Sequence, residues 1–281
     1  MNRQLRKYSP ILFWPLFLSF LIVFLIPFVL GIYLSFTEFT TVSDATFVGL
    51  KNYLTVVSSG GDFLNSLWFT IGFAAVSVIS INLLAFTLAM ILTRPLRGRN
   101  FFRTVFFMPN LIGGIVLGYI WQLIINGVLY NFGYSILSKA QFGFWGLVVL
   151  MNWQMIGYMM IIYIAGLQNV PHDQIEAAKV DGASNTRILF NITIPAVMPS
   201  ITICLFLTLT NSFKLFDQNL ALTAGAPAKQ TEMLALNIFN TFYGRSGYEG
   251  VGQAKAVIFS LLTAAIALLQ LYLTRRKEYE N

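Results

Sequence analysis

The sequence has very few of the residues on which metalloproteins and most enzymes depend. One cysteine, Cys204, and one histidine, His172, stand in 281 residues. A single cysteine forms neither a disulfide framework nor a thiolate metal site, and a single histidine leaves no pair for a metal ion. No Gly-x4-Gly-Lys-Ser/Thr loop is present to hold a nucleotide phosphate. We therefore expect no metal, no catalytic residues and no ATPase site in this chain.

Charged residues are also scarce. They make up 10% of the chain, against about 25% in soluble domains, whereas 57% of the residues are hydrophobic. The net charge of +7 would suit a nucleic-acid-binding protein, but the basic residues stand at the ends of apolar runs and form no single face. The composition predicts a protein of the lipid bilayer that binds no nucleic acid.

Six apolar runs without charge are long enough to cross a bilayer, which takes about 20 residues per helix. They occupy residues 11–37, 63–93, 104–138 (interrupted by Pro109), 140–171, 188–213 and 256–274. The first run follows basic residues as in a signal peptide, but it is too long and no small-x-small cleavage site follows it. We expect an all-α polytopic membrane protein with six transmembrane helices.

These runs divide the chain into three parts. Residues 1–62 would hold an N-terminal tail, the first span and an external connector, residues 63–274 a core of five spans, and residues 275–281 a C-terminal tail. Positive charge marks the cytoplasmic side of a membrane, and six spans place both termini on one side. That side would carry twelve of the 18 basic residues: Arg3, Arg6, Lys7, Arg94, Arg97, Arg99, Arg103, Lys179, Arg187, Arg275, Arg276 and Lys277. We therefore expect both termini in the cytoplasm.

The loop between the fourth and fifth runs is predicted to form two short helices on the cytoplasmic side. Asp173, with Glu176 three residues later, predicts an Asp version of the capping box. Gly182 stands where the chain reverses, and a side chain there should tilt the second helix away. Ser184 is expected to cap the second helix and Pro195 to end it.

The same loop carries a family resemblance. Glu-Ala-Ala at 176–178, Gly182 after three residues, and Ile-x-Ile-Pro ending at Pro195 resemble the cytoplasmic loop of permease subunits of binding-protein-dependent ABC importers. The pattern has Leu where this chain has Ile194. The resemblance implies the type I ABC importer permease fold, with a cytoplasmic helix-turn-helix coupling loop between spans four and five. It implies that a separate ATPase, which binds the ATP and Mg²⁺, contacts Glu176, Ala177, Ala178, Asp181 and Gly182. A hairpin lying on the bilayer surface is the alternative interpretation of this loop.

Other segments resemble the carbohydrate-uptake group of these permeases. Phe216-Asp217 leads to a Leu-Thr-Ala-Gly-Ala-Pro turn at 222–227, where the group has Leu-Thr-x-Gly-Gly-Pro, and residues 47–53 and 103–109 resemble the same group. The resemblance implies half of a sugar pathway in the inner membrane, a second homologous permease, two ATPase subunits and an extracytoplasmic sugar-binding protein. It places the substrate pathway at Asn152, Trp153, Gln154, Tyr158, Thr208, Asn211, Ser212 and Leu215. Such polar residues also serve to join neighbouring spans.

Two further features are open to more than one interpretation. Lys214 and Asp217, three residues apart near the end of the fifth span, would pair on a helix or extend separately to water. Gly114 and Gly118 have the spacing of a close helix crossing. A permease for glycerol phosphate or a polyol remains the alternative function. A secondary transporter would need an internal repeat or an intramembrane relay, and neither is visible in the sequence.

Overall fold

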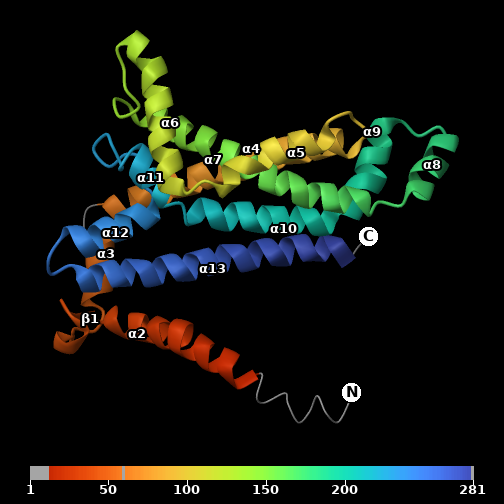
Figure 1. Ribbon diagram of the computed structural model, residues 1–281. Helices are drawn as coiled ribbons and strands as arrows, with labels where there is room; N and C mark the ends of the chain where they lie inside the picture. The colour runs from red at the N-terminus through yellow and green to blue at the C-terminus, as the bar shows by residue number, and fades with distance from the viewer. Residues whose placement is uncertain (1–12, 59–60, 280–281) are drawn as a thin grey trace, which may run out of the picture. The chain divides into compact units, whose positions relative to one another are not determined.

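The computed structural model describes residues 13–58 and 61–279, with side chains as far as Thr274 (Figure 1). In these ranges six helices are long and apolar enough to cross a membrane. They are Phe13–Leu34, Asp62–Thr93, Gly114–Phe132, Ala140–Gln168, Asn185–Phe213 and Glu249–Thr274. The prediction of an all-α membrane protein with six spans is confirmed. Arg3, Arg6 and Lys7 of the predicted N-terminal tail lie outside the described residues.

The first part of the chain holds the first span and a small folded connector. The span includes the π-helix η1 (Leu21–Leu25) and α2 (Ile26–Leu34), and the connector contains β1 (Thr37–Glu38), η2 (Val42–Asp44), β2 (Thr46–Phe47) and α3 (Lys51–Ser58). The two strands pair antiparallel, with Thr37 opposite Phe47.

Helices of very different lengths make up most of the rest of the chain. In chain order they are α4 (Asp62–Thr93), α5 (Arg99–Phe107), η3 (Met108–Leu111), α6 (Gly114–Leu129), η4 (Tyr130–Phe132), α7 (Ala140–Gln168), α8 (His172–Val180), α9 (Asn185–Ile188), η5 (Leu189–Thr193), α10 (Ile194–Phe213), α11 (Asp217–Leu222), α12 (Leu234–Gly244) and α13 (Glu249–Tyr279).

Three spans start three or more residues away from their predicted starts. The third is divided at Pro109 into α5, η3 and α6, so its membrane helix starts only at Gly114. The fifth and sixth start earlier than predicted, at Asn185 and Glu249. A charge such as that of Arg187 limits the depth of a helix in the hydrocarbon but does not end the helix. Apolar runs therefore locate the spans better than they locate the helix ends.

Contacts within the chain divide it into two compact units, one of residues up to 61 with 238–261 and one of 62–237 with 262 onward. In the smaller unit, the buried Asn52 side chain donates hydrogen bonds to the carbonyls of Ser35 at 3.0 Å and Thr37 at 2.8 Å. A Cβ on Gly250 would lie 2.2 Å from the Thr37 carbonyl oxygen. Asn52 and Gly250 therefore hold the start of α13 closely against the connector.

Asp44 closes the turn between the two strands of the connector. Its carboxylate accepts hydrogen bonds from the backbone N–H groups of Thr40 at 3.0 Å and Thr41 at 2.9 Å, and from the Thr40 hydroxyl. These bonds, that of the Thr40 hydroxyl above all, favour the ionised form and lower the pKa of Asp44 from 3.8 to about 2. A depressed pKa means that the carboxylate stabilises the turn above pH 3.8 and loses this effect as the pH falls through 2.

We expect the Thr41 amide resonance of the isotopically labelled chain to titrate with a midpoint near pH 2 instead of 3.8. The turn should stay ordered from neutral pH down to about pH 4 and lose its hydrogen bonds below that. Asp44→Asn should remove the titration, because the amide does not ionise in this range. A midpoint near 3.8 in the unchanged chain would show that the three hydrogen bonds do not hold in solution.

The core of the larger unit joins α4, α7 and α10. Asn82 of α4 accepts a hydrogen bond from the Tyr163 hydroxyl of α7 at 2.6 Å and donates one to the Thr208 hydroxyl of α10 at 2.9 Å. Polar side chains join spans in this way where lipid supplies no hydrophobic drive for association. Phe73 also meets Phe144 edge to face. Because contacts advance along both helices in the same order, α4 and α7 run parallel.

Candidate functional site

After α7 the chain forms a helical hairpin, α8 and α9, joined by a tight turn (Figure 1). Gly182 in the turn has a φ of +76°, which only glycine adopts freely. The N–H groups of Gly182 and Ala183 donate to the carbonyls of Lys179 at 3.1 Å and Ala178 at 2.9 Å. These two bonds form a Schellman motif, which satisfies the last carbonyls of α8. The predicted chain reversal at Gly182 is confirmed.

The two helices of the hairpin begin differently. Ser184 caps α9 as predicted, since its hydroxyl accepts the N–H of Arg187 at 3.3 Å. The capping box predicted for Asp173 and Glu176 is wrong, because α8 begins earlier, with Pro171 as its N-cap and no side-chain cap. Asp173 instead lies inside the first turn, where its negative charge interacts favourably with the helix dipole.

Pro195 does not end the second helix. The α9, η5 and α10 segments follow one another without a break, and together they form the fifth span. In η5 the turn is wider, and the N–H of Ile194 donates to the carbonyl of Leu189. Pro195, at the start of α10, is accommodated next to this wider turn. The hairpin is therefore continuous with a membrane span.

The residues of the predicted ATPase contact lie at the surface. Glu176, Ala177, Asp181 and Gly182 are exposed, and Ala178 is partly buried. Next to them Val180 is 88% exposed, and no atom lies within 4 Å of a Cβ placed on Gly182. Small side chains around one exposed apolar side chain make a surface that fits a groove on another protein.

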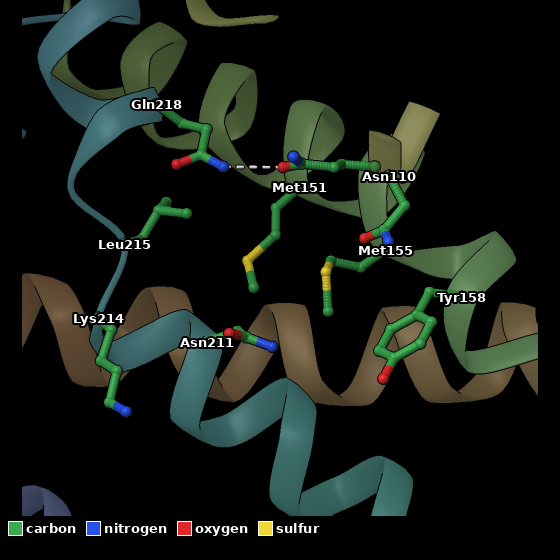
Figure 2. Close-up of a pocket in the computed structure, with 9 residues that line it drawn as sticks. Asn110, Met151, Met155, Tyr158, Asn211, Lys214, Leu215 and Gln218 are labelled. Atoms are coloured by element: carbon green, nitrogen blue, oxygen red, sulfur yellow. Dashed lines mark hydrogen bonds between the residues drawn. The ribbon is translucent and has the colours of Figure 1, made fainter. Parts of the chain in front are cut away.

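A pocket of about 270 Å³ lies among α7, α10, α11 and η3 (Figure 2). Its lining residues are Asn110, Met151, Gln154, Met155, Tyr158, Asn211, Lys214, Leu215 and Gln218. Gln218 donates to the side-chain oxygen of Gln154 at 2.8 Å, and Gln154 donates to the carbonyl of Ile112 at 3.3 Å. Amide groups beside an aromatic ring supply the hydrogen bonds and the flat face that a polyhydroxylated ligand needs.

The structure brings together half of the predicted pathway residues. Gln154 and Tyr158 of α7, Asn211 of α10 and Leu215 beyond it line the pocket. Asn152, Trp153, Thr208 and Ser212 do not line it.

Those four residues make other contacts. Asn152 donates to the Ser80 hydroxyl at 2.9 Å, Thr208 bonds Asn82, and the buried Ser212 donates to the Thr208 carbonyl at 2.7 Å. Trp153 packs edge to face on Trp121. They do not line this pocket because three of the polar groups are engaged in hydrogen bonds within and between helices, and their place in the substrate pathway stays a prediction.

The sequence allows Lys214 and Asp217 either to pair or to extend separately to water, and the structure has the second arrangement. Residues three apart are neighbours only on one helix, but α10 ends at Phe213 and α11 starts at Asp217. Both side chains are exposed, and within the described part of the chain they form no ion pair with each other. Asp217 interacts instead with the dipole of α11, and Lys214 lines the pocket.

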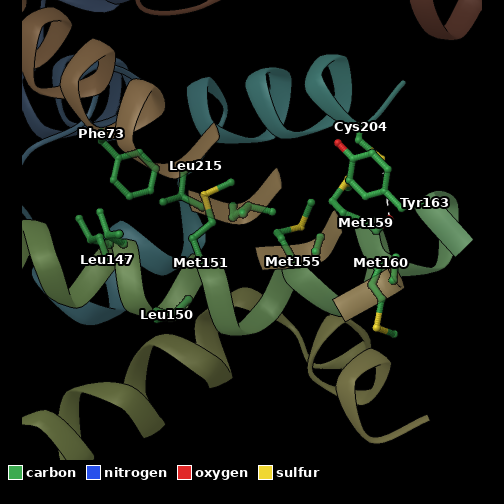
Figure 3. Close-up of a cluster of buried hydrophobic side chains, with 14 of the residues drawn as sticks. Phe73, Leu147, Leu150, Met151, Met155, Met159, Met160, Tyr163, Cys204 and Leu215 are labelled. Carbon is green, nitrogen blue, oxygen red and sulfur yellow. Dashed lines mark hydrogen bonds between the residues drawn. The ribbon is translucent and has the colours of Figure 1, made fainter. Parts of the chain in front are cut away.

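Four pocket residues were not anticipated from the sequence. Met151 and Met155 share a helical face with Gln154 and Tyr158, so the 3.6-residue period alone could have identified them. In Figure 3, Met151 and Met155 point to one side of α7, and Leu150 points to the other. Asn110 and Gln218 come from distant segments, and no local pattern relates them to α7.

Glycines bring the pocket walls together. A Cβ on Gly118 would lie 2.5 Å from the Cβ of Ala221, and one on Gly114 would lie 2.9 Å from the side chain of Gln218. Of the two interpretations of this glycine spacing, a close helix crossing or ordinary packing, the structure has the close crossing, between α6 and α11. Gln122 adds a hydrogen bond of 2.8 Å to the carbonyl of Leu222 at the end of α11. This contact positions Gln218 over the pocket.

The comparison with protein families gives one match that covers most of the chain. The model of the family described as "Binding-protein-dependent transport system inner membrane component" matches residues 81–279. The matched range contains both the hairpin and the pocket.

Relatives with assigned names match over nearly the same length. The chain is 47% identical to a probable starch degradation products transport system permease protein, AmyD, of Thermoanaerobacterium thermosulfurigenes, over 95% of this chain and 93% of that one. It is 31% identical to the trehalose/maltose transport system permease protein MalF of Thermococcus litoralis, over 85% and 83%. An sn-glycerol-3-phosphate permease of Agrobacterium fabrum, UgpA, is 29% identical over 84% of both chains.

Solved structures share the fold. A bacterial ABC transporter involved in the import of the acidic polysaccharide alginate matches with a TM-score of 0.82, over 98% of each chain, at 17% identity. The predicted fold, that of a type I ABC importer permease, is thereby confirmed.

Proposed function

Because the chain belongs to the family of binding-protein-dependent transport system inner membrane components, we propose that it is the permease subunit of an ATP-driven sugar importer. The chain is a multi-pass membrane protein, and its family consists of transport components, not enzymes. One observation carries the proposal: a single chain of this family combines an exposed hairpin, continuous with the fifth span, and a polar pocket next to that span.

A short oligosaccharide of glucose, such as the α-1,4-linked fragments of starch, is the proposed substrate. The 47% identity to a permease named for starch degradation products supports it. So does the pocket, where Gln154, Asn211 and Gln218 supply amides and Tyr158 supplies a ring. Neutral amides suit the hydroxyl groups of a sugar, which both donate and accept hydrogen bonds.

Glycerol phosphate is the weaker candidate, although a permease named for it is among the relatives. A phosphate group is recognised by clustered basic residues or by helix N-termini. Among the described residues that line the pocket, Lys214 is the single basic one. One lysine among amides and methionines favours an uncharged ligand.

The assembly that we propose follows from the hairpin. A second homologous permease would complete the pathway, because this chain supplies one set of six spans. Two ATPase subunits would bind ATP and Mg²⁺ and dock on the exposed surface around Glu176 and Gly182 of each permease. An extracytoplasmic binding protein would deliver the sugar to the connectors at 38–62 and 217–255. The hairpin and both termini would then face the cytoplasm, as the basic residues indicate.

Movement of the hairpin would be transmitted to the pocket through the helix of the fifth span. The fifth span carries the hairpin at its start and Asn211 near its end. When ATP draws the two ATPases together, the hairpins would move with them and rotate these spans, opening the pocket outward. Hydrolysis would reverse the motion, which is alternating access driven from outside the chain.

Asn211→Ala tests the pocket. The Asn211 side chain is exposed and makes no hydrogen bond within the described chain, so its removal should leave the fold intact and remove one sugar contact. We expect the apparent KM for maltotriose uptake by the assembled complex to rise up to about tenfold, the equivalent of one hydrogen bond of about 1.4 kcal/mol.

Ser212→Ala is the matched control. Ser212 neighbours Asn211, but it is buried, and its hydroxyl donates to the Thr208 carbonyl of its own helix at 2.7 Å and lies 3.7 Å from the sulfur of Met151. Its removal should leave the KM unchanged. Equal KM values for Asn211→Ala and the unchanged chain would remove Asn211 from the sugar site.

A further inference from the structure

A second concavity lies at the end of the larger unit away from the hairpin. It measures about 440 Å³ and is formed by the first turns of α4 and the loop between α11 and α12. Its volume falls within the range of about 300–1,000 Å³ that is usual for small-molecule sites. Because α4 and α7 run parallel, the first turns of α4 lie beside the start of α7. They are at the other end of these helices from the C-terminal end of α7, which leads into the hairpin. No function described above uses this concavity.

One wall of this concavity is an open aromatic face. Trp68 is 68% exposed and lines the concavity. Asn65 and Asp62 line it too, three and six residues earlier on the same side of α4. Phe69 beside them packs edge to face on Phe144, which fixes this part of α4 against α7. The indole is therefore held on a packed helix while its face stays uncovered.

The polar groups of the concavity are balanced in charge and accessible. Lys229 and Asp62 form an ion pair at 3.1 Å, with side chains 50% and 45% exposed, so both can bond a ligand as well. The side chains of Asn65 and Gln230 are exposed and make no hydrogen bond within the described chain. Carboxylate, ammonium and two amides present donors and acceptors with no net charge. That combination suits hydroxyl groups better than an ionised ligand.

The opposite wall is a loop fixed by its own hydrogen bonds. The Thr231 hydroxyl donates to the carbonyl of Ala226 at 2.7 Å, and the N–H of Gln230 donates to the carbonyl of Pro227 at 2.8 Å. Ala228 and Lys229 have φ values of 45° and 63°, a region that residues other than glycine rarely adopt. Such strained residues persist where the surrounding structure holds them, and they are common at ligand sites.

We propose that this concavity binds one ring of the incoming oligosaccharide, stacked on the indole of Trp68 and bonded through its hydroxyls to Asp62, Asn65, Lys229 and Gln230. Aromatic rings pack against the apolar C–H faces of sugars, and the surrounding polar groups then fix the orientation. The inference rests on the proposed function, which places this end of the unit outside the cell. The subsite would hold one end of the chain of sugars before another ring enters the pocket beside Gln154.

The experiment uses the full-length chain in lipid nanodiscs, with no ATPase or binding protein, and measures protection of a cysteine. Ala228→Cys places a thiol in the concavity, while the native Cys204 is fully buried and should give little background. We expect maltotriose to slow labelling by a membrane-impermeant maleimide about threefold at twice its Kd, when two thirds of the sites are filled. Mannitol, which has no ring to stack, should not slow it.

Variants separate stacking from other effects. Adding Trp68→Ala to Ala228→Cys should remove the protection, and Trp68→Phe should keep part of it, because a phenyl ring still stacks. Asn131→Cys, an exposed position in η4 at the end of the third span, should be labelled equally with and without sugar.

Two results would overturn the inference. One is no protection with maltotriose raised to about 50 mM, well above a millimolar Kd. The other is protection that Trp68→Ala leaves unchanged, which would make Trp68 only an anchor at the membrane interface. Sugar uptake by the assembled complex, without protection of the cysteine at position 228, would contradict this subsite but not the proposed function. Protection without sugar uptake would contradict the proposed function and leave this subsite supported.

Discussion

Gly182→Val is expected to reduce sugar uptake by the assembled complex at least tenfold while the chain still inserts in the membrane. Gly182 has a φ of +76°, and a left-handed residue with a side chain costs about 1–2 kcal/mol, with most strain for a β-branched one. Valine should therefore break the two bonds that end α8 and change the angle between α8 and α9. The measurement is uptake of radiolabelled maltotriose, together with ATP hydrolysis stimulated by the binding protein.

Gly182→Asn is the matched control, because asparagine tolerates the left-handed region. No described atom of this chain lies within 4 Å of a Cβ at Gly182, so a side chain there would tilt the second helix through strain in the left-handed backbone and not through a clash inside the hairpin. Asn should keep most of the uptake. If Asn fails as completely as Val, the constraint comes from a partner that approaches this glycine. Normal uptake with Val would remove Gly182 from the coupling mechanism.

Gly157→Ala should destabilise the permease more than any other substitution discussed above. A Cβ at Gly157 would lie 1.8 Å from the carbonyl oxygen of Phe106 and 2.7 Å from the backbone nitrogen of Phe107. Backbone atoms cannot rotate away as a side chain can, so α5 and α7 would have to separate. Overpacking costs about 1–3 kcal/mol or more, which corresponds to a fall in Tm of about 2–12 °C for a chain of this size.

The measurement is thermal unfolding in detergent, followed by a thiol-reactive dye. Cys204 is fully buried, so its reaction with the dye reports the loss of the fold. Gly72→Ala is the control, since it adds the same methyl group to α4, where nothing lies within 4 Å. Its Tm should stay the same or rise slightly, because alanine favours a helix over glycine by about 1 kcal/mol. Equal Tm values for the two variants would show that α5 and α7 are not closely packed.

Gly157 also connects stability with the pocket. It lies on α7 between Gln154 and Tyr158, and the α5 segment that it contacts leads directly into η3 with Asn110. A separation of α5 from α7 would widen the pocket from this side. We therefore expect Gly157→Ala to raise the KM for sugar in whatever fraction of the chain remains folded.

The spans could be predicted because a bilayer imposes one strong requirement. Its hydrocarbon core demands about 20 apolar residues per helix, and each of the six runs meets that demand. The ends of the helices follow another rule, since a helix continues in water for as long as its backbone N–H and C=O groups find hydrogen-bond partners. That is why the fifth span begins at Asn185 and passes Pro195, and why the sixth begins at Glu249.

The site was harder to predict because residue type does not reveal orientation. Asn152, Thr208 and Ser212 are pathway candidates by residue type, yet the side-chain nitrogen of Asn152 and the hydroxyl of Thr208 bond other helices, and the hydroxyl of Ser212 bonds within α10. Asn211 is adjacent to Ser212 in sequence but lines the pocket. A one-residue step turns a helix by about 100°, so a pattern in one segment cannot say which side faces its neighbours. Gln218 needed the contact between α6 and α11, which only the three-dimensional structure provides.

The widened turn at Leu189–Thr193 has a geometric consequence for the hairpin. A π-helical turn is an α-helix with one residue inserted, and one residue corresponds to about 100° of rotation about the helix axis. Deleting a single residue there would restore a regular helix and swing Gly182 to a different side of the bundle, with Asn211 left in place. The direction in which the hairpin projects from the bundle is thus set by the number of residues in the five-residue segment η5. The residues that form the pocket do not affect it.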